Sequence, residues 1–292
     1  MVISNFILKI IALIFMTIDH VGVFLPSSPL QFTFRVLGKI ALPIFIYTTL
    51  EGCKKTKDIK KYMLRLGVMS ILMYIAIVIA QLVLYFNNGY LLVFQNIFFT
   101  LLNLVFIYYL FFVNKNKNKN KRRMVILPIL IFIGSYIFFL LRINGISEFI
   151  SSIFVDGLTT MYALEAPIMF VGALLGIYIY EEIVRKKLNN DETLVNEFLC
   201  SKKAQLSRNI IMCLSIALVS LIMYSFTYEN IPSFTFGNTC IYNTYFIICF
   251  PFILLYNGKR GFNNKIVNGA FYLYYPLHIG IIALIFILIG GF

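Results

Sequence analysis

Charged residues are scarce in this chain. They make up 13% of its 292 residues, whereas 60% of the residues are hydrophobic. Because a soluble domain carries about 25% charged residues, this composition excludes an ordinary soluble protein. Apolar runs of roughly 20 residues, the length that crosses a bilayer core, recur along the sequence. We therefore predict an all-α, multi-pass protein of the cell membrane, with residues 1–292 forming a single transmembrane domain.

Cysteines are few, and the features of a cleaved signal peptide are missing. The five cysteines show no pair spacing typical of a metal site, and most lie in segments expected in the membrane or the cytoplasm. We therefore predict neither a metal site nor structural disulfides. The first apolar run is too long for the hydrophobic region of a signal peptide, and no small-residue cleavage site follows it. It is expected to remain as a transmembrane helix.

Basic residues outnumber acidic ones, 25 to 12, which gives a net charge of +13. They cluster in every second connection between apolar runs, as in 53–61 and 114–123, which is the positive-inside pattern. This distribution indicates membrane topology rather than nucleic-acid binding. The pattern predicts a helical bundle with a cytoplasmic N-terminus, an extracytoplasmic C-terminus and about nine spans: 5–25, 31–51, 62–86, 90–113, 124–142, 159–180, 208–228, 237–256 and 267–290.

Seven ionisable residues lie well inside these spans. A charge at the bilayer centre costs about 3 kcal/mol or more, so such residues face a bundle interior or an aqueous cavity. This group is where we look for function, and it comprises Lys9, Asp19, His20, Arg35, Lys39, Glu165 and His278.

The stretch MTIDHVGVF places Asp19 beside His20, one of only two histidines. Adjacent residues on a helix point about 100° apart, so Asp19 is not expected to orient His20. We predict that Asp19 pairs with Arg35 or Lys39 and that His20 faces a cavity. A neutral imidazole in a dry site is a competent general base. The alternative is a histidine that serves packing alone.

The other cations of the first two spans fit the same scheme. Lys9 precedes His20 by eleven residues, which puts both on one helix face, about 16 Å apart along the axis. The alternative is a lysine that reaches the headgroups. Arg35 and Lys39 are spaced i, i+4 and project from one side of the second helix, where they either pair with Asp19 or bind an anion. Pro43 should kink this helix.

The last span holds the second histidine, His278, in YLYYPLHIG. Tyr274 lies one turn before it on the same face, where its hydroxyl is placed to contact a polar substrate. Glu165, in another span, is a candidate anionic partner for the cations and a second candidate substrate contact. A histidine satisfied by interhelical hydrogen bonds is the alternative for His278.

Three parts of the sequence resemble the TraX family of membrane proteins and, more distantly, the acyltransferase-3 group of transmembrane acyltransferases. They are KIIALIFMTIDHVGVF (9–24), FRVLGKIALPIF (34–45) with EGCKKTKDIKKYMLRL (51–66), and YNGKRG…FYLYYPLHIGII (256–282). The acyltransferase-3 signature of a basic residue, ten residues and a histidine is matched by Lys9 and His20. That group's Arg-x-x-Arg motif is absent from this chain.

The resemblance implies an integral membrane acetyltransferase that takes its acyl group from cytoplasmic acetyl-CoA. The acceptor would be extracytoplasmic, either the N-terminal amine of pilin or a cell-surface glycan, and the oligomeric state, a homo-oligomer included, is left open. The site assignments that follow are His20 as catalytic base, Asp19 and His278 in the catalytic site, Tyr274 and Glu165 as substrate contacts, and Lys9, Arg35 and Lys39 as ligands of coenzyme A.

Two other functions use the same residues differently. A proton-coupled transporter or exporter would use Asp19, His20, Glu165 and His278 as a proton relay, although the sequence shows no internal repeat of the kind common in transporters. A structural subunit of a secretion or conjugation apparatus would use the intramembrane charges as clamps between helices. We expect an enzyme, with the transporter as the principal alternative.

Overall fold

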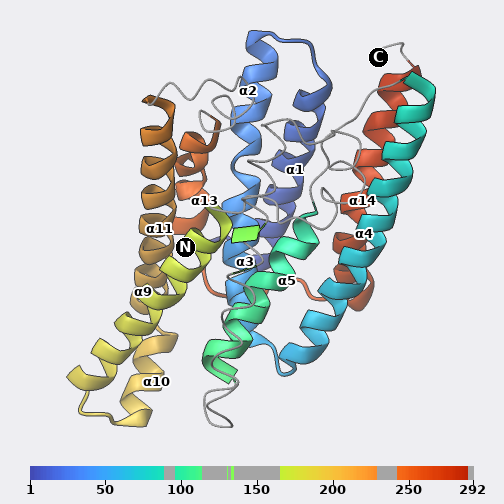
Figure 1. The fold of residues 1–292 in the computed structure, drawn as a ribbon. Coiled ribbons are helices and arrows are strands. Elements are labelled where there is room, and N and C mark those ends of the chain that lie inside the picture. Colours follow the sequence, from blue (N-terminus) through green and yellow to red (C-terminus); the bar gives the residue numbers. More distant parts are fainter. Residues whose placement is uncertain (89–95, 114–129, 131–132, 135–164, 229–241, 289–292) are drawn as a thin grey trace. The chain divides into compact units, whose positions relative to one another are not determined.

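The computed structural model describes residues 1–88, 96–113, 130, 133–134, 165–228 and 242–288 (Figure 1). Within these residues the regular structure is helical, and Ile3 and Tyr256 form an isolated β-bridge. The all-α prediction is therefore confirmed for the described chain. The helices, in chain order, are α1 (Asn5–Phe24), α2 (Pro29–Gly38), α3 (Ala41–Lys55), α4 (Ile59–Asn88), α5 (Ile97–Tyr108), η1 (Tyr109–Val113), α9 (Glu165–Lys187), α10 (Glu192–Cys200), α11 (Lys202–Tyr228), η3 (Thr244–Cys249), α13 (Phe250–Leu254) and α14 (Lys265–Leu288).

Five helical segments of the described residues are long and apolar enough to cross a bilayer. Three shorter apolar segments accompany them, at 97–112, 244–254 and 266–282. The expected span 124–142 lies almost entirely outside the described residues. A multi-pass membrane protein is thus supported, whereas the count of nine spans and the orientation of the termini stay predictions. The five segments are Asn5–Phe24, Pro29–Lys55, Ile59–Ile79, Glu165–Lys187 and Lys202–Ser225.

The chain divides into two compact units. The first comprises Met1–Thr48 with Ile168–Phe292, and the second comprises Thr49–Pro167. In the second unit α4 packs against α5, and the Asn96 side chain donates a hydrogen bond to the Ser70 carbonyl oxygen at 2.8 Å. In the first unit α2 and α14 pack against α1, while α10, η3 and α13 pack against α11. Whether the units act as one domain stays a prediction.

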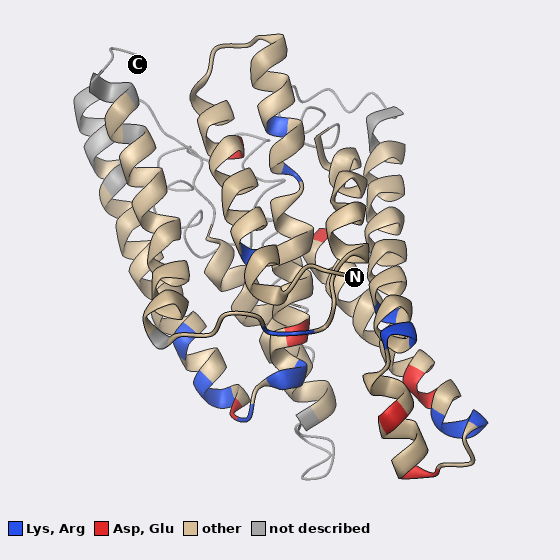
Figure 2. Ribbon diagram, turned by 180° about the vertical axis from the view of Figure 1, so that it is seen from behind, with Lys and Arg blue, Asp and Glu red and all other residues tan. Residues whose placement is uncertain are grey.

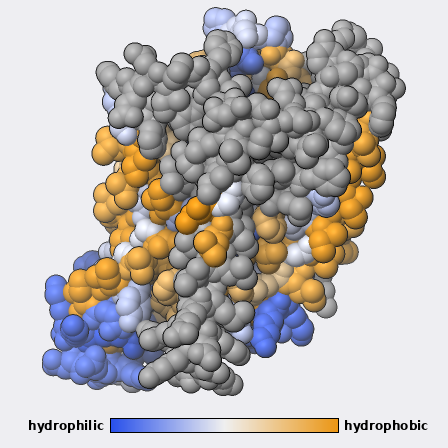
Figure 3. All heavy atoms as spheres, viewed as in Figure 1, coloured by the Kyte–Doolittle hydropathy of each residue, from blue (hydrophilic) through white to orange (hydrophobic). Residues whose placement is uncertain are grey.

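The outer faces of the first unit's helices are apolar. Leu214, Leu218 and Leu221 of α11 are each at least half exposed, as is Ile179 of α9, which is the surface expected of helices that face lipid chains. Hydrophilic side chains gather instead around α10 and the adjacent end of α9 (Figure 3). Figure 2 shows charged residues at the same end and only a few along the middle of the helices.

α1 and α2 form a tight antiparallel hairpin because small residues lie where the helices cross. A Cβ added at Gly38 would lie 2.2 Å from the Asp19 Cβ, and one added at Gly22 would lie 2.9 Å from the Phe34 Cβ. The α2 helix starts from a Ser28 cap, whose side chain accepts from the Gln31 backbone N–H at 3.1 Å, with Pro29 at its first position. The hairpin thereby brings α2 against the polar face of α1.

The second predicted span is interrupted, as Pro43 led us to expect. α2 ends at Gly38 and α3 begins at Ala41, with short-range turns from Lys39 N–H to the Val36 carbonyl and from Ile40 N–H to the Leu37 carbonyl. Proline has no N–H to donate to the carbonyl four residues earlier, here that of Lys39. Because Pro43 instead sits in the first turn of α3, where backbone N–H groups lack helical acceptors, the break costs little.

α14 lies alongside α1 and runs parallel to it. Phe6 of α1 contacts Phe271, with ring centroids 5.9 Å apart, and Thr17 farther along α1 reaches Tyr274. The start of α1 is anchored by backbone hydrogen bonds, from Ile3 N–H to the Leu255 carbonyl at 3.0 Å and from Asn5 N–H to the Lys259 carbonyl at 2.9 Å. This anchoring fixes the register of α1 close to where α14 begins.

Candidate functional site

Asp19 forms an ion pair with Arg35 of α2. One Asp19 carboxylate oxygen lies 2.9 Å from Arg35 Nη1, and the two side chains are 11% and 22% exposed. This confirms the prediction that Asp19 turns toward the second helix rather than toward His20. The carboxylate supplies the opposite charge that a cation inside an apolar helix pair requires.

Arg35 and Lys39 share one aromatic partner, which places them on the same side, as their spacing predicts. The Tyr242 ring centroid lies 5.5 Å from the Arg35 guanidinium carbon and 5.9 Å from the Lys39 Nζ. The negative face of an aromatic ring attracts both cations. Lys39 is only 1% exposed, so in this arrangement its ammonium is covered, whereas Arg35 keeps some exposure.

His20 and His278 meet at the contact between α1 and α14. His20 Nδ1 lies 2.6 Å from His278 Nε2, and the ring centroids are 4.8 Å apart. His278 is 5% exposed and His20 is half-buried. Two residues 258 positions apart in sequence thus share one hydrogen bond. The interpretation of His278 as a histidine held between helices is confirmed, and the same contact connects it directly to the predicted base.

The other ring nitrogen of His278 is also bonded. His278 Nδ1 lies 2.8 Å from the carbonyl oxygen of Tyr274, one turn earlier on α14. The Tyr274 ring stacks on the His278 ring, with centroids 5.0 Å apart and an interplanar angle of 11°. Both nitrogens of His278 are therefore engaged by groups on two helices, which fixes the orientation of its ring.

The Tyr274 hydroxyl has a partner that sequence reasoning missed. It lies 2.7 Å from Thr17 Oγ1, and the same Thr17 hydroxyl donates to the Leu13 carbonyl oxygen at 2.9 Å. Because the single Thr17 proton goes to Leu13, Tyr274 must be the donor to Thr17. The predicted contact of this hydroxyl with a substrate would replace the bond to Thr17. The available signal was the position of Thr17 three residues before His20, on the same helix face.

Two further aromatic residues of the site were not predicted. Tyr275 is buried and presents its ring edge-on to both histidines, with centroids 5.9 Å from His20 and 5.6 Å from His278. It directly precedes Pro276 in the motif that drew attention to His278. Tyr242, the partner of the two cations, lies in a segment whose pattern carries no sign of this role.

Lys9 faces α14, as its shared face with His20 predicts. Its Nζ lies 5.5 Å from the centroid of Phe271, while His20 contacts the same helix farther along.

Glu165 is the first residue of α9, is 8% exposed and belongs to the second unit. Its assignment as a substrate contact therefore stays a prediction. In the part of the chain that the structure describes, no group of three or more His, Cys, Asp or Glu residues is arranged to hold a metal ion.

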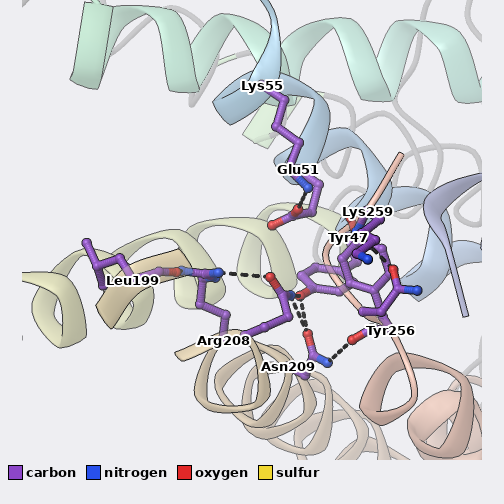
Figure 4. Close-up of polar contacts among 10 residues, drawn as sticks. Tyr47, Glu51, Lys55, Leu199, Arg208, Asn209, Tyr256 and Lys259 are labelled. Carbon is purple, nitrogen blue, oxygen red and sulfur yellow. Dashed lines mark hydrogen bonds and ion pairs between the residues drawn. The ribbon is translucent and has the colours of Figure 1, made fainter. Parts of the chain in front are cut away.

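A second polar cluster, also missed, joins α3 to α11 (Figure 4). The Tyr47 hydroxyl donates to Asn209 Oδ1 at 2.6 Å, and Asn209 Nδ2 donates to the Tyr256 carbonyl at 2.9 Å. Gln205 Nε2 donates to the same Asn209 oxygen at 2.8 Å, and Arg208 Nη2 donates to Gln205 Oε1 at 2.9 Å. These groups satisfy one another, so the cluster acts as a structural clamp. Figure 4 also shows the ion pair of Lys55 with Glu51, one turn apart on α3.

Comparison with known proteins adds one finding. A protein-family model described as "TraX protein" matches residues 4–179, more than half of the chain. No curated protein and no solved structure matches. The matched region contains Asp19, His20 and Arg35 but ends before His278. Similarity to the acyltransferase-3 group stays a prediction.

Proposed function

The chain belongs to the TraX family, and from this premise we propose that it is a membrane-embedded acetyltransferase. It takes an acetyl group from acetyl-CoA on the cytoplasmic side of the membrane. It delivers that group to an amine or hydroxyl acceptor on the other side, such as the N-terminus of a pilin subunit or a surface glycan. The observation that carries this proposal is the hydrogen bond between His20 and His278 in the apolar contact of α1 and α14.

The proposed chemistry uses His20 as a general base. The imidazole takes the proton of the acceptor's amine or hydroxyl as that group attacks the carbonyl carbon of the thioester. The new carbon–nitrogen or carbon–oxygen bond forms and the carbon–sulfur bond breaks. The departing thiolate then takes the proton from His20 and leaves as coenzyme A. The base returns to its neutral form, so atoms and charge balance over one turnover.

The cations next to the histidines supply the electrostatic part of the proposal. Arg35 forms an ion pair with Asp19, the immediate neighbour of His20. Arg35 and Lys39 both lie over the Tyr242 ring. The Arg35 side chain keeps 22% of its surface exposed, and a partly exposed cation attracts an anionic ligand. Lys9 extends the basic character toward the start of α1. Because Arg35 is more exposed than Lys39, it is the preferred contact of the donor.

The proposal is tested by donor binding. We expect saturable binding of acetyl-CoA to the purified protein in detergent, measured by calorimetry and by the shift in thermal stability. Ligand at 100 times its Kd adds about 2.7 kcal/mol to the unfolding free energy. Arg35→Ala should weaken binding, and His20→Ala should bind acetyl-CoA but fail to transfer labelled acetyl to cell-envelope material. The matched control is Leu277→Ala on the exposed face of α14. Full transfer by folded His20→Ala protein would refute the assignment.

One observation favours the alternative of a proton relay. Two hydrogen-bonded histidines form a path along which a proton could move from one helix to another. Against this, Asp19 is committed to Arg35. If a well-folded sample shows no acetyl-CoA binding, proton uptake by reconstituted vesicles, lost in His20→Ala and in His278→Ala, would support the relay.

A further inference from the structure

The two histidines and the Tyr274 carbonyl form a series of hydrogen bonds with one direction. We propose that His278 is a positioning residue that holds His20 in the tautomer protonated at Nδ1. In this arrangement His20 Nε2 is the nitrogen that receives the acceptor's proton. This inference rests on the proposed function for its chemical consequence, whereas the tautomer itself is a property of the folded protein and can be measured without any activity.

The direction follows from the one group in the series that cannot donate. The Tyr274 carbonyl oxygen only accepts, and it lies 2.8 Å from His278 Nδ1. His278 Nδ1 must therefore carry a proton. A neutral His278 then has its lone pair at Nε2, which must accept from His20 Nδ1 at 2.6 Å. A neutral His20 consequently has its lone pair at Nε2.

The surroundings hold both rings in this orientation. Tyr274 stacks on His278 with an interplanar angle of 11°, and Tyr275 presents its edge to both imidazoles. The Tyr274 ring is fixed in turn by the bond from its hydroxyl to Thr17. With the His278 proton moved to Nε2, the contact with the Tyr274 carbonyl would have no proton. With the His20 proton moved to Nε2, the contact between the two rings would have none. That loss is costly for a His278 side chain that is 5% exposed.

This arrangement also suits the protonated form of the base. When His20 Nε2 takes a proton, His20 Nδ1 keeps its own proton and continues to donate to His278 Nε2. The bond then has a charged donor, and such hydrogen bonds are about twice as strong as neutral ones. His278 thus stabilises the imidazolium that forms during transfer. It does so without exchanging a proton itself, which is the difference between a positioning residue and a second acid or base.

The tautomers can be read directly, because the chain contains only two histidines. The protein labelled with [15N]histidine is examined in detergent by long-range nitrogen–proton correlation NMR at pH about 8, above the ordinary histidine pKa near 6.5. We expect both rings in the form protonated at Nδ1, whereas free histidine favours protonation at Nε2. His278→Ala assigns the remaining signals to His20. Finding His20 protonated at Nε2 in the wild-type protein would overturn the proposal.

Two substitutions at His278 separate positioning from proton transfer. In His278→Gln the side-chain amide oxygen can still accept from His20 Nδ1 but cannot titrate, whereas His278→Ala removes the acceptor. We expect His278→Ala to lower the rate constant of acetyl transfer by about 100-fold, the scale of general-base catalysis. His278→Gln should keep most of the rate and the His20 tautomer. A His278→Gln protein as inactive as His278→Ala, with His20 still protonated at Nδ1, would contradict a positioning role.

The two proposals can fail separately. If acetyl-CoA neither binds nor reacts while the NMR spectrum shows both histidines protonated at Nδ1, the acetyltransferase function fails and the ordered pair of rings stands. If transfer occurs with His20 protonated at Nε2, the function stands and the positioning role fails. Leu277→Ala serves as the control in both measurements, because Leu277 adjoins His278 in sequence and is 58% exposed. It should alter neither spectrum nor rate.

Discussion

At the scale of single residues, neighbours in sequence have different partners. Asp19 binds Arg35 of α2, whereas His20 binds His278 of α14. The turn of about 100° between adjacent helical residues produces this division. One charged face of α1 therefore stabilises the α1–α2 hairpin, and the adjoining face presents the proposed base. The small residue opposite Asp19 makes the ion pair possible.

That small residue, Gly38, provides a residue-scale prediction. Gly38→Ala places a Cβ 2.2 Å from the Asp19 Cβ, so α1 and α2 must move apart or Asp19 must turn. We expect a loss of about 1–3 kcal/mol in the unfolding free energy, as for other overpacked sites, together with weaker acetyl-CoA binding. Thermal unfolding in detergent measures the loss. Gly269→Ala is the control, because a Cβ there meets nothing within 4 Å. Equal stabilities for the two variants would show that the crossing is not tight.

At the scale of helices, local signals set the ends and tertiary contacts set the partners. Ser4, Ser28, Asn96 and Asp191 each cap a helix through a side-chain oxygen, and Ser, Asn and Asp are all favoured N-caps. Pro43 accounts for the break between α2 and α3. The predicted topology makes the first and last spans parallel, but no local feature of α14 indicates that it lies beside α1, because that pairing depends on contacts between residues more than 250 positions apart.

The Asp191 cap gives a pH-dependent prediction outside the membrane-spanning helices. The Thr193 side-chain hydroxyl and the Leu194 and Thr193 backbone N–H groups hold the pKa of Asp191 below its ordinary value. A lowered pKa means that the cap's stabilisation is complete above the unfolded value, about 3.9, and is lost as the pH falls through the folded pKa. The protection of the α10 amides against hydrogen exchange, corrected for the intrinsic exchange rate at each pH, should therefore fall on acidification. Asp191→Asn should keep the cap without this pH dependence, and an unchanged dependence would assign it to another group.

At the scale of the whole molecule, the distribution of Lys and Arg predicts which ends of the helices face the cytoplasm. The segment between α9 and α11 is basic at both sides of α10, and hydrophilic residues gather there (Figure 3). The positive-inside pattern assigns it to the cytoplasmic side. The same assignment puts the proposed donor on the side where basic loops attract coenzyme A phosphates.

Cys200 tests this topology. It is exposed at the end of α10, whereas Cys53, Cys213 and Cys249 are buried. In a Cys240→Ser background, a membrane-impermeant maleimide should label inverted membrane vesicles and leave intact cells unlabelled. Adding Cys200→Ser should abolish the labelling, which serves as the control. Labelling of Cys200 in intact cells would reverse the predicted orientation of the whole chain.

The class of this protein follows from its sequence, and the same sequence singles out the residues that we propose for its site. Apolar runs require helices in a bilayer, because backbone groups in lipid must be satisfied within the segment. Ionisable residues in those runs are costly enough to identify a site, and the angle between Asp19 and His20 predicts that they face different partners. The predicted partner of Asp19 was Arg35 or Lys39, and the structure shows the ion pair with Arg35.

Packing between the helices sets the partners of these residues and the direction of their hydrogen bonds. Only folding brings His278 to His20, Tyr274 to Thr17 and Tyr242 to the two cations. Sequence spacing reports which residues share a helix face, but it carries no information on which face of another helix will be opposite. The tautomer of His20 is further removed from the sequence, because it depends on an acceptor two hydrogen bonds away, the Tyr274 carbonyl, which acts on His20 only once α14 packs against α1.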